Sequence, residues 1–257
     1  MTTMTLVTRK RSTAIKVLII TIVTMSLSII SGFVNSLYFT SKPDLTKMVL
    51  ASTGITESES HSGKIIGANL KPIVGNFSVH EQSFESSSGS VIDECITPGN
   101  HRIIRFDFLI HNTGKTDLAV GDPELRPDLF IYSAAHKHYH MKDFNEFVLF
   151  DRSGNQTNIV EKQGFCLRDS KPISTWANPK SGPWNCDSNQ GISAGWADLY
   201  EKTLACQFVV INGIADGDYT LVSTTNAQHT LYEETYEDNS VETDLQITGD
   251  SVTSVIH

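Results

Sequence analysis

The chain has 257 residues and a formal net charge of −9, with 39% hydrophobic and 19% charged residues. These values are ordinary for one globular domain behind a targeting segment, and an acidic surface that repels phosphates argues against a nucleic-acid partner. The first 34 residues carry four basic and no acidic side chains, so subtracting those four charges from −9 leaves −13 for the remainder. Such a surface either only confers solubility or steers a cationic substrate.

A basic stretch and then a long apolar run open the chain. Arg9–Lys16 holds the four basic residues, and Val17–Phe39 is mostly apolar, which is the pattern of an export signal. The run is long enough to cross a bilayer, which takes about 20 residues, so it is either a cleaved signal peptide or a single membrane anchor. The basic residues stay in the cytoplasm in both cases. We therefore expect an extracellular domain, secreted or anchored to the outer face of the cell membrane.

This organisation divides the chain into three parts. Residues 1–39 are predicted to be the signal peptide or anchor. Residues 40–69 are predicted to be a flexible linker, because they contain few large apolar side chains. Residues 70–250 are predicted to be one domain.

Short apolar segments separated by turn residues make up this domain. In Arg102–Ile110, large apolar residues stand at every second position, and Asn112-Thr113-Gly114 ends the run, which predicts a strand and a turn. Similar runs recur at Phe144–Phe150, Cys206–Ile211 and Tyr219–Ser223, and no long stretch keeps a helical period. The predicted fold class is all-β, a β-sandwich core with long irregular loops and little helix.

The four cysteines, Cys95, Cys166, Cys186 and Cys206, all lie in the predicted domain, and none belongs to a CxxC pair. An even number of widely spaced cysteines in an exported chain predicts disulfides. Three pairings are possible from the sequence alone. A metal cluster held by these cysteines would need a different ligand spacing.

The segment His136-Lys137-His138-Tyr139-His140 is the clearest sign of a metal site. On an extended strand, alternate residues share one face at about 6.6–6.8 Å per step. The three imidazoles are therefore predicted to hold one ion together. Neutral imidazoles without a thiolate suit Cu(II) or Zn(II), and the pattern alone does not choose between them. The alternative interpretation is a histidine-rich surface strand.

The histidine segment extends to HKHYHMKDFNEF and is accompanied by four further segments in order: IIRFDFLIHNTGKTD (103–117), EKQGFCL (161–167), QGISAGWADLYEKTLACQF (190–208), and DGDYTL (216–221) with YEDN (236–239). Together they resemble the lysyl oxidase family over roughly residues 70–248. The family resemblance implies a copper-dependent amine oxidase that converts primary amines, above all peptidyl lysine, and O2 into aldehyde, hydrogen peroxide and ammonia.

The resemblance also implies roles for individual residues. The copper ligands would be His136, His138 and His140. Lys162 and Tyr200 would cross-link to form lysine tyrosylquinone, the organic cofactor of the family. Lys162 can add to the oxidised ring only as a neutral amine, so its surroundings must favour deprotonation from a free pKa of about 10.4.

Asp198 matches an acidic position of the family and is a candidate general base. Its alternative is a turn residue that faces solvent. The resemblance further pairs Cys166 with Cys186 and Cys95 with Cys206.

The chain also departs from the family pattern. Ala135 and Trp196 stand where the family has further cysteines. The calcium loop of the family is only partly kept, because Glu233, Asp238 and Asn239 offer oxygens but Thr235 replaces an acid.

Two other functions compete with the amine oxidase. An exported copper-binding protein could keep the fold without turnover. A zinc hydrolase would be expected to carry a partner motif such as HExxH, which is not found in the sequence.

Overall fold

The computed structural model describes residues 67–157 and 161–255, all within a compact unit of residues 63–257. The predicted signal peptide or anchor, and the predicted linker up to residue 66, lie outside the described residues. In the described part of the chain, no helix is both long enough and apolar enough to span a bilayer.

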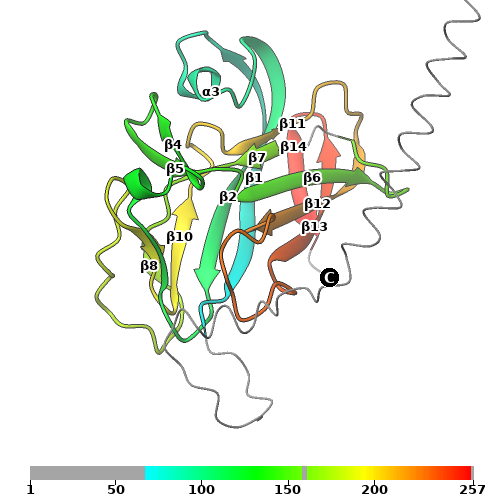
Figure 1. Ribbon diagram of the computed structural model, residues 1–257. Helices are drawn as coiled ribbons and strands as arrows, with labels where there is room; N and C mark the ends of the chain where they lie inside the picture. Colours follow the sequence, from blue (N-terminus) through cyan, green and yellow to red (C-terminus); the bar gives the residue numbers. More distant parts are fainter. Residues whose placement is uncertain (1–66, 158–160, 256–257) are drawn as a thin grey trace, which may run out of the picture. The chain divides into compact units, whose positions relative to one another are not determined.

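Two five-stranded sheets form the body of this unit, and every strand pair in them is antiparallel (Figure 1). The first sheet runs in the order β1 (Leu70–Phe84), β2 (Gly99–Asn112), β10 (Trp196–Tyr200) and β8 (Lys171–Pro172), and β11 (Phe208–Val210) also pairs with β2. The second sheet runs in the order β14 (Ser251–Val255), β13 (Ser240–Thr248), β12 (Gly217–Thr225), β6 (Asn145–Asp151) and β7 (Glu161–Gln163).

Smaller elements complete the fold. Two-stranded ribbons are formed by β3 (Leu118–Gly121) with β9 (Gln190–Ile192) and by β4 (Phe130–Ser133) with β5 (His138–Met141). The described helices are short: α3 (Gly89–Ile92) and the 3-10 turn η1 (Pro123–Leu125). The short helix α3 and the β4–β5 ribbon lie at the same end of the domain (Figure 1). The prediction of an all-β fold with little helix is confirmed.

The alternation of apolar side chains in β2 is what joins the two sheets. Phe106 and Phe108 are fully buried and share one face of the strand, since successive side chains of a strand point to opposite faces. Both rings meet Phe147 of β6 edge to face, with centroids 4.9 and 5.1 Å apart. Such pairs are favourable beyond the area that they bury. The core of the sandwich therefore lies between β2 of one sheet and β6 of the other.

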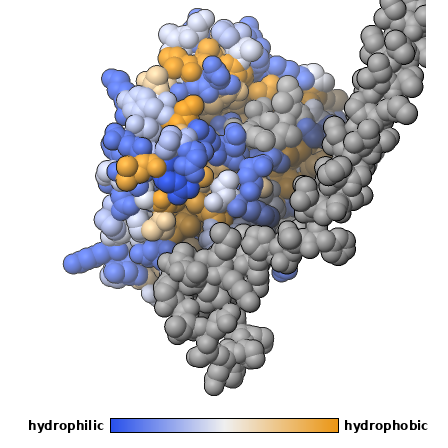
Figure 2. All heavy atoms as spheres, viewed as in Figure 1, coloured by the Kyte–Doolittle hydropathy of each residue, from blue (hydrophilic) through white to orange (hydrophobic). Residues whose placement is uncertain are grey.

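The surface contrasts with this interior. On the face shown in Figure 2, hydrophobic and hydrophilic residues are interspersed. Single exposed apolar side chains, such as Leu125 with 77% exposure, are normal on a folded protein. The interior, in contrast, holds fully buried phenylalanines such as Phe106, Phe144 and Phe208.

The expected strands are present, with shifted ends. The run in Arg102–Ile110 forms the middle of β2, and the run in Phe144–Phe150 forms most of β6. The run in Cys206–Ile211 contains β11, and the run in Tyr219–Ser223 lies inside β12. These predictions are confirmed because the alternating pattern reports directly on which side chains the sheet buries.

Two disulfides tie the loops to the sheets. Cys95 is bonded to Cys206 across 111 residues, and Cys166 is bonded to Cys186 across 20 residues. This is the pairing that the family resemblance implied. Chain-entropy models give such links about 3–5 kcal/mol each, with the longer loop at the upper end.

The core contact between the sheets yields the first prediction. Replacing Phe147 with Ala removes the ring that both β2 phenylalanines contact, and it leaves a cavity. We expect Phe147→Ala to lower the free energy of unfolding by about 3–5 kcal/mol, measured by urea denaturation of the full chain with its disulfides intact. Leu125→Ala, at an exposed site, should change it by less than about 0.5 kcal/mol. A loss below about 1 kcal/mol for Phe147→Ala would contradict this account of the core.

Candidate metal centre and buried tyrosine

The three histidines do not lie on one strand, and this part of the prediction is wrong. His138 and His140 are in β5, whereas His136 lies in the turn of residues 134–137 that joins β4 to β5. Lys137 has a φ of 60°, a left-handed conformation that reverses the chain direction. The turn therefore folds His136 back over the strand. Its ring lies close to His140 although the two residues are four positions apart.

The turn brings the three imidazoles together at one point. His136 Nδ1 lies 3.1 Å from His140 Nε2, and that atom lies 3.2 Å from His138 Nε2. One nitrogen from each ring can be chosen so that all three are within 4.8 Å of one another. Two donors that bind one ion at about 2.0–2.1 Å lie about 2.8–3.4 Å apart at right or tetrahedral angles. The observed spacing of the donors thus fits a single metal ion.

Burial favours the neutral form of His138 and His140. The pKa of His140 is lowered to about 4, first by burial and then by the neighbouring His136 and His138. The pKa of His138 is lowered as well, mainly by burial. Because only a neutral imidazole can bind a metal ion, the site is suited to coordination at neutral pH.

Tyr200 and Asp198 lie on β10, next to the central strand. Tyr200 pairs with Phe108 and Asp198 pairs with Ile110 of β2. Both side chains are buried, with 4% and 2% exposure. The Tyr200 hydroxyl donates a hydrogen bond to Asp198 Oδ2 at 2.7 Å, and it lies 3.3 Å from the Cys166 carbonyl oxygen. Asp198 is therefore not the solvent-facing turn residue that the alternative interpretation described.

The pair is held in a setting that resists ionisation. Burial raises the pKa of Asp198 from 3.8 to about 6, although hydrogen bonds from Tyr200, Arg168 and Ser170 pull it down. The pKa of Tyr200 is raised by burial and then by the Asp198 charge, and Arg168 offsets part of this effect. A carboxylate with a pKa near 6 that already accepts the phenol hydrogen bond is a competent proton acceptor.

Phe165 connects the tyrosine to the histidines. Its ring stacks on Tyr200 with centroids 4.5 Å apart, and it lies 5.9 Å from the His140 ring. All three histidines, Phe165, Tyr200 and Asp198 line one cavity of about 430 Å³, and the Cys166–Cys186 disulfide forms part of its wall. The structure therefore brings the proposed copper ligands, the tyrosine and the carboxylate to one site.

Lys162 lies in β7, where it pairs with Glu146 of β6. Its side chain lies outside the described part of the structure. Two residues later, a Cβ added to Gly164 would collide with the Met141 carbonyl oxygen at the end of β5. Only glycine therefore lets the Lys162–Phe165 segment pass so close to the strand that carries two of the histidines.

Two residues that shape this site were not predicted from the sequence. Arg168 donates its backbone N–H to Asp198 Oδ2 at 3.0 Å, and its side chain lines the cavity. Ser170 donates its hydroxyl to Asp198 Oδ1 at 2.9 Å. The sequence places Arg168 and Ser170 just after Cys166, whose disulfide with Cys186 lies on the cavity. Nothing else in the sequence indicates that they contact Asp198.

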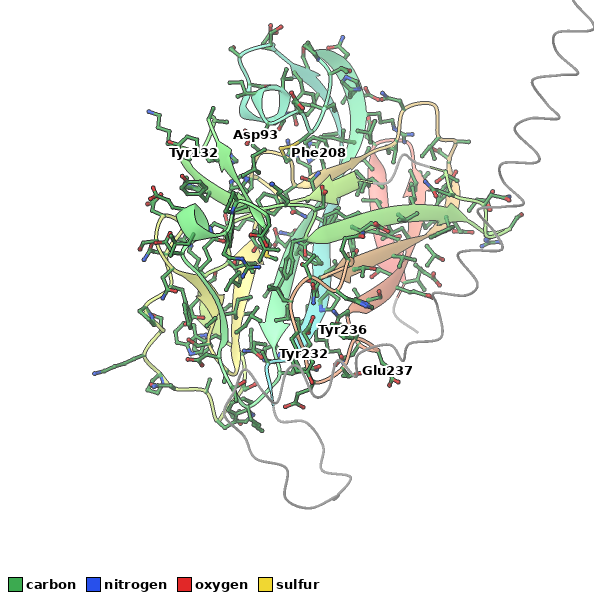
Figure 3. All side chains as sticks on the ribbon, viewed as in Figure 1. Asp93, Tyr132, Phe208, Tyr232, Tyr236 and Glu237 are labelled. Atoms are coloured by element: carbon green, nitrogen blue, oxygen red, sulfur yellow. A yellow bond between two sulfur atoms is a disulfide. The ribbon has the colours of Figure 1, made fainter. Side chains whose placement is uncertain are left out.

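The residues considered for calcium lie elsewhere. Glu233 is buried, and its carboxylate accepts hydrogen bonds from Asn226, Asn239 and the Leu70 backbone. Asp238 Oδ1 is buried and has no hydrogen-bond partner among the described residues, which leaves an acceptor oxygen for a cation. In Figure 3 the neighbouring Tyr232, Tyr236 and Glu237 lie at the opposite end of the domain from Asp93. Calcium stays a prediction.

A β-sandwich with three converging imidazoles beside a buried tyrosine–carboxylate pair is a distinct class of site. The family model described as lysyl oxidase matches residues 73–256 of this chain. The chain belongs to the lysyl oxidase family.

Several vertebrate proteins are similar to the chain. Lysyl oxidase homolog 2 of Gallus gallus is 27% identical over 155 residues, which is 59% of this chain and 19% of the relative. The homolog 2 of Xenopus tropicalis is 32% identical over 161 residues, 62% of this chain and 20% of the relative. Lysyl oxidase homolog 4 of Bos taurus is 25% identical over 211 residues, 78% of this chain and 27% of the relative. The chain thus spans only about a fifth to a quarter of the curated relatives that it matches.

The raised pKa of Asp198 yields a prediction for stability. The folded state binds this proton at a higher pH than the unfolded state does, so the contribution of Asp198 to the free energy of unfolding falls as the pH rises from 4 to 6. Two pKa units correspond to roughly 3 kcal/mol. The free energy of unfolding of the wild type minus that of Asp198→Asn should therefore fall by up to about 3 kcal/mol between pH 4 and pH 7. Both free energies are measured by urea denaturation.

Asp187→Asn is the matched control, because Asp187 is an exposed carboxylate on the same cavity. Its difference from wild type should change by less than half as much over this range. A constant difference for Asp198→Asn would show that the buried carboxylate does not hold its proton more tightly in the folded state.

Proposed function

We propose that the protein is a copper-dependent amine oxidase. It would convert a primary amine, O2 and water into an aldehyde, ammonia and hydrogen peroxide, with peptidyl lysine as the substrate class. The single observation that carries this proposal is one cavity, in a member of the lysyl oxidase family, that is lined by three metal-ready imidazoles and a buried tyrosine.

The metal would be held by His136, His138 and His140. Three imidazoles without a thiolate suit Cu(II), which stands above Zn(II) in the affinity order of divalent metals. Bound copper, together with O2, supplies the oxidising power for making the organic cofactor and for renewing it after each turnover. The protein contributes a compact set of three nitrogen donors, and burial lowers the pKa of two of them, His138 and His140.

Tyr200 and Lys162 would provide the organic cofactor, lysine tyrosylquinone. The support for Tyr200 is its burial on the cavity wall and the stacking of its ring on Phe165. The support for Lys162 is its place three residues before Phe165, on the segment that passes close to β5. The protein's part is to fix the tyrosine ring, because a cross-link forms only when the two groups are held in one geometry.

Asp198 would serve as the general base. Its carboxylate accepts the Tyr200 hydrogen bond and is screened from water, so it can take up the phenol proton and, later, the proton from the substrate carbon that bears the amine. A base with a pKa near 6 works well at neutral pH, since it is mostly ionised yet still basic. Arg168 and Ser170 hold the carboxylate in place.

The substrate and the setting follow from charge and cysteine use. An acidic protein attracts cationic polypeptides and amines before it binds them. Two disulfides among the described residues fit an oxidising compartment, which supports an extracellular location. A protein secreted or anchored outside the cell would meet both O2 and exposed lysine side chains there.

The test of this proposal is a spectrum combined with an activity assay. The full chain, exported into an oxidising compartment with copper, should show a visible chromophore that reacts with phenylhydrazine. It should also release hydrogen peroxide only when a primary amine is present. Tyr200→Phe and Lys162→Arg should abolish both signals while leaving bound copper in place, because neither residue is a proposed copper ligand.

Two control variants separate these effects from general damage. Tyr232→Phe, at an exposed tyrosine on the opposite end of the domain, should keep the chromophore and the activity. His138→Ala should lose copper and both signals, whereas His80→Ala, at an exposed histidine of β1, should lose neither. Full copper loading without chromophore or peroxide would favour the second candidate, an exported copper-binding protein without turnover.

A further inference from the structure

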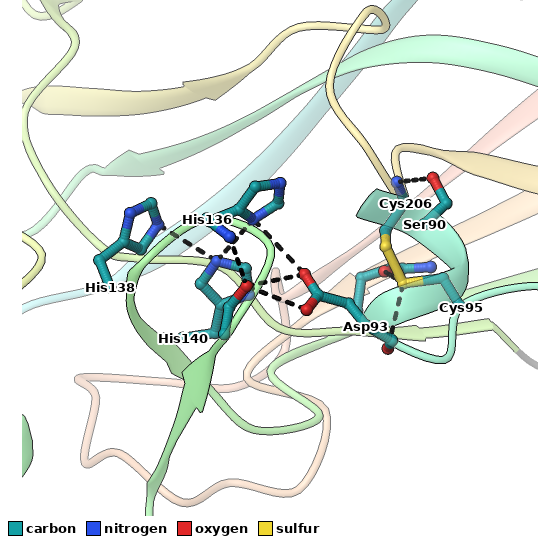
Figure 4. A network of polar contacts seen from close by, with 9 residues as sticks. Ser90, Asp93, Cys95, His136, His138, His140 and Cys206 are labelled. Carbon is teal, nitrogen blue, oxygen red and sulfur yellow. Dashed lines mark hydrogen bonds and ion pairs between the residues drawn. A yellow bond between two sulfur atoms is a disulfide. The ribbon is translucent and has the colours of Figure 1, made fainter. Parts of the chain in front are cut away.

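A carboxylate from a distant part of the chain also lies beside the histidines. Asp93 stands directly after α3, and its Oδ2 lies 3.6 Å from His136 Nδ1 (Figure 4). This is the same nitrogen that lies 3.1 Å from His140 Nε2. The carboxylate therefore approaches His136 on the side where the imidazoles converge, and not on the ring nitrogen that points away from them.

This position differs from that of an ordinary supporting carboxylate. A carboxylate that only orients a metal-binding histidine accepts a hydrogen bond from the nitrogen that does not bind the metal. Asp93 instead faces the metal-ready nitrogen. Donor atoms of one ion lie about 2.8–3.4 Å apart, so the 3.6 Å between Asp93 Oδ2 and His136 Nδ1 is just outside that range. Among the described residues of this site, only the three imidazoles have donor atoms that already lie within 4.8 Å of one another, so the carboxylate would have to move toward the ion when the metal binds.

We infer that Asp93 is a fourth protein donor of the metal centre, supplying one carboxylate oxygen beside the three imidazole nitrogens. The inference rests on the proposed binding of copper by the histidines. A carboxylate would lower the net charge of the bound Cu(II) centre from two to one. It would also complete a set of three nitrogens and one oxygen, a combination that suits Cu(II).

The surroundings of Asp93 are built to hold it there. Its side chain is only 13% exposed. The Ser133 hydroxyl lies 2.8 and 3.0 Å from the two carboxylate oxygens, and it also accepts the backbone N–H of His136 at 3.0 Å. One serine at the end of β4 thus fixes both the carboxylate and the turn that carries His136.

A covalent link holds α3 against the domain. Cys95, two residues after Asp93, is bonded to Cys206, whose backbone N–H donates to Ser90 Oγ in α3 at 3.1 Å. Figure 4 shows this link next to the carboxylate and the three imidazoles. The disulfide therefore places the proposed oxygen donor, while the histidines are placed by their own hairpin.

The test compares copper binding by the wild type and by Asp93→Asn, both as the full chain. Copper affinity is measured by competition with a chelator, and the Cu(II) centre is recorded by electron paramagnetic resonance. We expect Asp93→Asn to bind copper about 10–100-fold more weakly. We also expect a higher g∥ and a smaller A∥, because the centre gains one unit of positive charge, while the nitrogen hyperfine pattern of three imidazoles persists.

Two further variants make the comparison sharp. Glu94→Gln, which removes an exposed carboxylate from the adjacent position, should leave the affinity and the spectrum unchanged. Ser133→Ala keeps the Asp93 carboxylate but removes the hydroxyl that holds it. This variant should therefore weaken copper binding by less than Asp93→Asn does. It also serves as the test if Asp93→Asn fails to fold, as judged by its thermal unfolding without metal.

The outcomes are distinguishable. Equal affinity and an unchanged spectrum for Asp93→Asn would overturn the inference, while copper binding by the wild type would leave the proposed function standing. If Ser133→Ala is the only folded variant, an unchanged affinity and spectrum would overturn it in the same way. A wild-type protein that binds no copper at the histidines would overturn both.

Discussion

The pairing of β2 with three other strands is the constraint on which the rest of the structure depends. One edge of β2 pairs with β1, and the other pairs with β10 and β11. The strand register sets Tyr200 opposite Phe108, and the same phenylalanine packs on Phe147 in the second sheet. Because a slip of one residue would turn every side chain to the opposite face, the burial of the β2 aromatics also fixes the direction in which the site tyrosine points.

Burial then sets the chemistry of the site. Tyr200 donates a hydrogen bond to Asp198 where both side chains are almost fully buried, so this bond is stronger than it would be in water. The histidines lie nearer the surface, and the pKa values of His138 and His140 are lowered because their positive forms would lose hydration and be repelled by neighbouring imidazoles. The same fold therefore prepares nitrogen donors on one wall of the cavity and a proton acceptor on another.

Local patterns predicted the strands and the histidine segment well, since alternation and spacing are readable over a few residues. The alternating run of β2 was found in this way, and so was the convergence of the three histidines. The turn that folds His136 back was missed, because a left-handed Lys137 leaves no mark in composition. Asp93 and Arg168 were missed for another reason: their approach depends on disulfide and strand pairings between distant segments. Burial of Asp198 likewise required the register of β10 on β2.

All three histidines fall within five consecutive residues, on a hairpin of their own. Closing so short a loop costs little conformational entropy, so the three imidazoles can gather around an ion before the two sheets have met. Asp93 precedes His136 by more than forty residues, so bringing it to the histidines closes a longer loop at a higher cost in conformational entropy. A partly folded chain would thus offer a divalent ion a site made of nitrogen donors alone. The choice of metal would then depend on which ion is abundant in the compartment where folding finishes.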